Sequence, residues 1–134
     1  MNPQVLIQAV LALDSINETT IAAVLGLGLT LRDENPYWAF FEGEPILVFA
    51  SVTWATSKLD QRWRLTVQYA LDRCNYPENA LDFAPYGQRA NVYLNPDIAP
   101  EGSYTHVFLY SGHKLYFEFT YLSHRLLGIT IERP

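Results

Sequence analysis

The sequence predicts an α+β domain, in which two N-terminal helices pack on a mainly antiparallel, meander-rich β-sheet of about seven to eight strands. Two observations support this prediction. Apolar residues recur at helical spacing in the first 25 residues, and from residue 27 onwards they alternate with polar residues at a period of two. Short turns separate most of the alternating runs, which is typical of an antiparallel meander.

The C-terminal part, Tyr104 to Glu132, has the clearest strand pattern. Three alternating runs are joined by two short turns, and residues 111–113 form the first of these turns. In the middle run, Phe117 and Phe119 fall on one face and Glu118 on the other, because successive strand side chains point to opposite faces. We therefore expect a three-stranded meander with one fully apolar face, which another layer must cover.

Two helices are predicted at the N-terminus. The first spans residues 3–13, since Pro3 stands at the first helical position and the apolar residues after it repeat with helical spacing. Ser15 and Glu18 have the spacing of a capping box and predict the start of a second helix. Gly26 is expected to end that helix.

The middle of the chain contains four more predicted strands and a long irregular segment. The strands span residues 27–32, 37–41, 46–56 and 62–71. Residues 33–36 and 43–45 are predicted turns, because acidic side chains there stand beside Pro or Gly. Residues 72–103 are rich in Pro, Asn and Gly, and only residues 89–94 read as a strand. This segment is either a binding lid or a connection between two meanders.

A chain of 134 residues is expected to form one domain, residues 1–134, that buries a core without a covalent or metal cross-link. Residues 1–13 lack the basic start and the cleavage site of a secretory signal, and no apolar run approaches the ~18 residues that span a bilayer. A lone Cys74 fits a reducing compartment. We therefore expect a cytoplasmic location, while a periplasmic one would require that a signal peptide had been removed.

The net charge of −5 lies entirely in the first half of the chain. Residues 58–134 hold eight acids and eight bases, whereas residues 1–57 hold six acids and only Arg32 as a base. This distribution argues against nucleic acid or an anionic membrane as a partner and favours a cationic protein. The six acids are Asp14, Glu18, Asp33, Glu34, Glu42 and Glu44.

The sequence predicts no catalytic residue, no metal site and no cofactor. The three histidines, His106, His113 and His124, lack the ligand spacing of a zinc site, and we interpret each as a surface or hydrogen-bonded residue. Cys74 has no flanking signature of a nucleophile and is interpreted as a packing residue. Carboxylates that meet only in space leave no sequence pattern, so an enzymatic function is left open but is not favoured.

The strand Tyr37 to Phe41 combines aromatic residues with acidic neighbours on either side. Such a strand is either buried on both faces or presents an exposed aromatic patch of the kind found in protein interfaces. On the second interpretation the acidic turns lie at opposite ends of this strand and flank the contact. The predicted partner-binding residues are Asp33, Glu34, Trp38, Glu42 and Glu44.

The function that these observations favour is a non-enzymatic protein-binding domain: a small acidic inhibitor or immunity-type protein that occludes a cationic protein partner. The alternative is a small-molecule-binding or enzymatic cone, in which the helices close a curved sheet over an apolar pocket. The residues expected to line that pocket are Trp54, Trp63, Tyr69 and Phe117.

Overall fold

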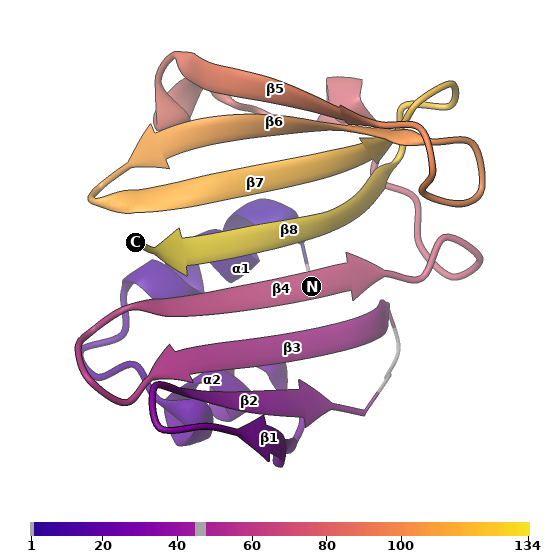
Figure 1. The fold of residues 1–134 in the computed structure, drawn as a ribbon. Helices are drawn as coiled ribbons and strands as arrows, with labels where there is room; N and C mark the ends of the chain where they lie inside the picture. The colour runs from indigo at the N-terminus through magenta and orange to yellow at the C-terminus, as the bar shows by residue number, and fades with distance from the viewer. Residues whose placement is uncertain (1, 45–47) are drawn as a thin grey trace.

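The structure is a computed structural model that describes residues 2–44 and 48–134. It confirms the predicted class, because two helices cover one face of an eight-stranded antiparallel sheet (Figure 1). No helix in the described residues is long and apolar enough to cross a bilayer. The strands are β1 Leu29–Glu34, β2 Trp38–Gly43, β3 Phe49–Ser57, β4 Trp63–Tyr69, β5 Arg89–Asn95, β6 Ser103–Tyr110, β7 His113–Thr120 and β8 Leu126–Arg133.

The sheet consists of two four-stranded meanders in the order β1-β2-β3-β4-β8-β7-β6-β5. The last strand of the first meander, β4, pairs antiparallel with the last strand of the chain, β8. This pairing leaves β1 and β5 as the two edges of the sheet, at opposite ends of the view in Figure 1.

The first helix, α1 Pro3–Leu11, is two residues shorter than predicted, and Asn2 caps it by accepting from the N–H of Gln4. The second helix, α2 Glu18–Leu25, is capped by Asn17, so the predicted capping box between Ser15 and Glu18 is wrong.

The cap of α2 shows why the prediction failed. The side-chain oxygen of Asn17 accepts from the N–H groups of Thr19 and Thr20, and the Thr20 hydroxyl accepts from the Asn17 N–H. The capping box is therefore present, but it begins two residues later than the S-x-x-E spacing indicates. Gly26 ends α2 as predicted, with a φ of 71° that favours glycine.

The core lies between the helices and the sheet. The helices bury Leu6, Ile7, Val10 and Ile21, which are fully inaccessible to solvent. The sheet contributes the predicted face of β7, with Phe117 and Phe119 buried. The four residues that the alternative interpretation assigned to a pocket are also part of this core and are at most 4% exposed: Trp54, Trp63, Tyr69 and Phe117.

The irregular segment predicted at residues 72–103 connects the two meanders and completes the core. It contains two short 3₁₀ turns, η1 Glu78–Ala80 and η2 Ala84–Tyr86, before β5. The ring of Phe83 lies 5.0 Å from that of Phe117, and Tyr86 is buried beside the same ring. Residues 78–86 therefore pack on the second meander.

The predicted turns around β2 require a correction. Asp33 and Glu34 lie in β1 instead of a turn, and the chain turns at residues 35–37. Asn35 stabilises this turn by accepting from the N–H groups of Tyr37 and Trp38. The second predicted turn, residues 43–45, begins at the end of β2, but residues 45–47, which include the predicted start of the next strand, lie outside the described residues.

We predict that Phe117→Ala lowers the free energy of unfolding by roughly 3–5 kcal/mol, because it empties a buried site among three other aromatic rings. Glu118→Ala is the matched control on the opposite face. It removes the acceptor of the Ser103 hydroxyl bond and should cost about 1 kcal/mol. Urea titration of both variants checks the register, which is wrong if the two costs are equal.

We also predict that Gly128→Ala destabilises the fold by roughly 1–3 kcal/mol. A Cβ at Gly128 would lie 2.7 Å from the carbonyl oxygen of Val67, across the junction of β8 and β4, so the strands must separate to admit it. Gly28→Ala is the control, because a Cβ there meets no atom within 4 Å. Thermal unfolding of both variants measures the difference, and equal melting temperatures would contradict the prediction.

Candidate functional site

A hollow of about 920 Å³ opens on the face of the sheet opposite the helices, near the β1 edge. Strands β1 to β4 and β8 contribute its lining. Three of the predicted partner-binding residues, Asp33, Trp38 and Glu42, line this hollow. The other two, Glu34 and Glu44, are exposed but do not line it.

The aromatic part of the hollow is formed by Trp38 and Phe40, which lie on the same face of β2. Their rings are stacked with centroids 6.5 Å apart, and Trp38 is half-buried while Phe40 is 39% exposed. Phe41 points to the other face and packs against the core. The predicted strand is therefore buried on one face only, and its outer face presents two aromatic rings to solvent.

Arg62 and Asp60 complete the aromatic site. The guanidinium carbon of Arg62 lies 5.3 Å from the Trp38 ring centroid, in a cation–π contact. Asp60 accepts from the backbone N–H and the Nε of Arg62, and these hydrogen bonds lower the pKa of Asp60 to about 2. Because Asp60 stays ionised at any physiological pH, it holds the cation over the indole ring.

The acidic residues of the site are mostly paired with bases. Glu42 lies 3.2 Å from Arg32, and Glu34 lies 2.7 Å from Lys58. These side chains are between 37% and 60% exposed, so each pair contributes at most about 1 kcal/mol to stability. The local charge is therefore more balanced than the sequence suggests, and the pairs can be exchanged at low cost.

The pairing of β1 with β2 explains how Arg32 reaches Glu42. A bulge between Leu31 and Asp33 leaves Arg32 unpaired and places Asp33 opposite Phe40, two residues along β2 from Glu42. The acids at 33 and 42 are therefore neighbours on one face, whereas the sequence analysis placed the acidic turns at opposite ends of a strand.

Four arginines line the hollow and were not predicted as part of a site: Arg32, Arg62, Arg64 and Arg133. Arg62 and Arg64 fall on the outward positions of an alternating run, so the period of two places them on the solvent face of the sheet. That signal was available in the sequence. The bulge at Arg32 leaves no local pattern.

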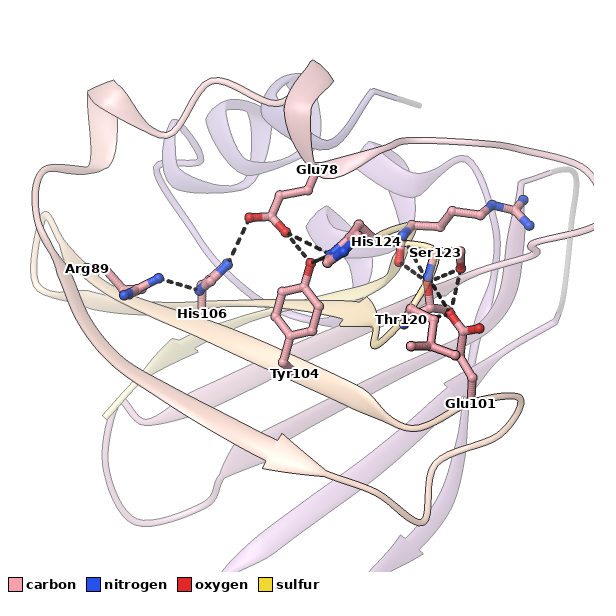
Figure 2. A network of polar contacts seen from close by, with 10 residues as sticks. Glu78, Arg89, Glu101, Tyr104, His106, Thr120, Ser123 and His124 are labelled. Carbon is pink, nitrogen blue, oxygen red and sulfur yellow. Dashed lines mark hydrogen bonds and ion pairs between the residues drawn. The ribbon is translucent and has the colours of Figure 1, made fainter.

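A second polar cluster lies at the β6 end of the sheet and joins four residues from three separate segments of the chain (Figure 2). Tyr104 donates its hydroxyl proton to Glu78, and the phenol oxygen lies 2.6 Å from Nδ1 of His124. His106 Nε2 lies 3.2 Å from the other Glu78 oxygen. Sequence reasoning missed this cluster, because its members lie in η1, in β6 and in the turn after β7.

The cluster anchors the connecting segment to the sheet. Burial, together with the Glu78 hydrogen bond, raises the pKa of Tyr104 well above its ordinary value, so the phenol stays neutral and continues to donate. Arg125 adds further bonds, donating to the carbonyl oxygens of Leu71 and Cys74. Glu101, just before β6, accepts from the N–H groups of Leu122 and Ser123 and so connects its own loop to the turn between β7 and β8.

The structure also shows where His113 and Cys74, which were interpreted from sequence as non-catalytic residues, lie. His113 lies with its ring 5.5 Å from that of Trp63, far along the sheet from the Tyr104 contact of His124. Cys74 is partly buried and packs against the core, and burial raises the pKa of its thiol. Among the described residues, no group of three or more His, Cys, Asp or Glu has an arrangement that could hold a metal ion.

No protein-family model, curated protein or solved structure matches this chain.

We predict that stability falls as pH rises above about 10, the ordinary pKa of tyrosine. Tyr104 and Tyr69 both have pKa values raised by burial, so the stabilisation is complete below that pH and is lost as pH rises toward their folded-state pKa values. Tyr104→Phe should make this loss shallower, while costing about 1 kcal/mol at neutral pH. Tyr37→Phe, at an exposed ring, is the control. Urea midpoints measured from pH 8 to about 11 test the prediction, which fails if the parent and Tyr104→Phe decline in parallel.

Proposed function

We propose that this chain is a non-enzymatic protein-binding domain, an inhibitor or immunity-type protein of the cytoplasm that occludes a cationic protein partner. The observation that carries the proposal is the partly exposed Trp38–Phe40 pair in a hollow whose lining includes Asp33 and Glu42. Exposed aromatic rings beside charged groups are typical of the residues that dominate protein interfaces.

The apolar contribution comes from the two rings. Burying Phe40 and the open side of Trp38 removes apolar surface from water, at about 25 cal/mol per Å². A lysine or arginine of the partner that enters the hollow would take the place of Arg62 over the Trp38 ring, retaining a cation–π contact. The rings thus favour a partner with an exposed basic side chain.

The acidic contribution depends on exchange of ion pairs. A basic side chain of the partner can replace Arg32 at Glu42, or Lys58 at Glu34, because both existing pairs are exposed and weak. Once the interface excludes water, the new pairs are stronger than the ones they replace. Glu44, beyond the end of β2, extends the acidic rim.

A second candidate function is the binding of a small ligand in the same hollow. Its volume of about 920 Å³ falls in the range of ligand sites, and Arg62 and Arg64 on its wall suit a planar anion. This hollow lies on the open face of the sheet, whereas the sequence analysis expected a ligand pocket between the helices and the sheet. The charge variants below separate the two candidates, since an anionic ligand gains from added bases.

We predict that Glu34→Lys with Glu44→Lys weakens partner binding at least tenfold and leaves the melting temperature nearly unchanged, because exposed charges contribute little to stability. The control is Asp14→Lys with Asp72→Lys, which gives the same net charge of −1 (−5 plus 4) at exposed positions elsewhere. Immobilised parent and both variants would capture basic proteins from a lysate of the source cell, and the affinity and on-rate of each purified partner would then be measured.

Two further measurements sharpen this test. The on-rate should fall steeply as salt is raised, because attraction between opposite charges is screened beyond roughly 8–10 Å at physiological ionic strength. Trp38→Ala should weaken binding further while the domain stays folded, since the ring is only half-buried. A partner that binds the double reversal as tightly as the parent, or whose on-rate ignores salt, would contradict the proposed mode of binding.

A further inference from the structure

The two edge strands of the sheet differ in how they are protected against pairing with another strand. At one edge, β1 carries Arg32, Asp33 and Glu34 and is bent by a bulge after Leu31. Charges and bulges are the devices by which natural edge strands avoid adding another strand. The β1 edge, next to the proposed binding site, is therefore protected against pairing with another strand.

The other edge, β5, lacks charge where it is regular. A bulge at Ala90 follows Arg89, and residues 91–95 then pair in register with β6. This stretch, Asn-Val-Tyr-Leu-Asn, contains no charged residue and no proline. All seven residues of β5 are exposed, with Tyr93 at 54% and Leu94 at 69%. An exposed apolar edge of this kind is a ready template for another strand.

The backbone of β5 shows which groups are available. The N–H of Val92 donates to the side chain of Asn91 at 2.8 Å, which indicates that this N–H points away from β6. Because backbone groups alternate in direction along an antiparallel strand, those of Leu94 also point to the outer edge. A strand laid beside β5 would replace the local bond at Val92 and add new ones at both residues.

We propose that β5 pairs antiparallel with the β5 of a second copy of this chain, forming one continuous sheet across a two-fold axis near Tyr93. This register sets Val92 of each copy opposite Leu94 of the other, with their outward N–H and C=O groups facing each other. The tyrosines lie opposite one another on the open face, and the aliphatic pairs lie on the helix side.

The charge distribution permits a second copy at this edge. An interface between identical chains repels if it brings together residues of one sign. Here the acids of residues 1–57 lie on or near α2 and in β1–β2, at the far edge of the sheet, and residues 90–95 are uncharged. Two copies therefore approach along the one long edge where their net negative charge is weakest.

This dimer is independent of the proposed function. It leaves the Trp38 hollow of each copy open at the outer ends of the joined sheet. A monomer can bind a cationic partner, and a dimer can exist without one, so failure of either proposal leaves the other standing.

Light scattering after size-exclusion chromatography tests the proposal, with the purified chain loaded from about 1 µM to about 1 mM. The mass of the parent should rise from 15.3 kDa toward twice that value. Tyr93→Lys with Leu94→Lys should remain at 15.3 kDa throughout, because like charges would face each other across the axis. The matched control is Thr30→Lys with Leu31→Lys, which adds the same charge to exposed positions of β1 and should still dimerise.

Spin labels locate the interface. In a Cys74→Ser background, a label at Tyr93→Cys should show a separation between copies within about 15 Å. A label at Leu31→Cys should show roughly 70 Å, since fifteen strand spacings of about 4.8 Å separate the outer edges. A parent that stays monomeric up to about 1 mM, which would leave β5 to a strand of another protein, overturns the proposal. So does a dimer that survives the β5 charges or that is lost with the β1 charges.

Discussion

The pairing of β4 with β8 is the constraint on which the rest of the molecule depends. Each four-stranded meander alone would have two open edges. Joining the last strand of each meander makes one sheet, so that Leu65 and Val67 of β4 continue the buried row of Ile129 and Ile131 in β8. Strands β4 and β8 approach so closely at Gly128 that a side chain there would meet the backbone carbonyl oxygen of Val67.

This topology also requires the long connection. To end beside β4, the second meander must begin at the far edge, so residues 70–88 cross from the end of β4 to β5. A polar segment on that path loses its water wherever it touches the core, and its groups need partners. Glu78 with Tyr104, and Arg125 with two backbone carbonyls, supply them, while Phe83 adds apolar contact. The path of the chain therefore accounts for the polar cluster around Glu78, whose hydrogen bonds hold this connection on the sheet.

The sequence predicted the structure correctly where that structure depends on the local alternation of apolar and polar residues. It predicted the faces of β7, the number of strands and the two helices, because side-chain direction and hydrophobic period are set within a few residues. It failed for properties that depend on a partner strand. The bulge at Arg32, the assembly of Glu78 with His106, and the strand order all require knowledge of register between segments tens of residues apart. Of the predicted contact residues, Asp33, Trp38 and Glu42 line the hollow, but the arginines that surround them were not predicted.

The open face of the sheet has consequences at both edges. An antiparallel sheet with helices on one side leaves its other face to solvent, and alternation fills that face with Thr, Gln and paired charges such as Arg64 with Glu132. Aromatic rings on such a face are costly to leave exposed, and the sheet carries them at two places, Trp38 with Phe40 near one edge and Tyr93 at the other. The first group lies among charged side chains that select a partner by sign, whereas the second lies among uncharged residues next to backbone groups that point to the outer edge. Different neighbours thus give the two ends different recognition chemistry, side-chain charge at β1–β2 and backbone pairing at β5, although both arise from the same open sheet.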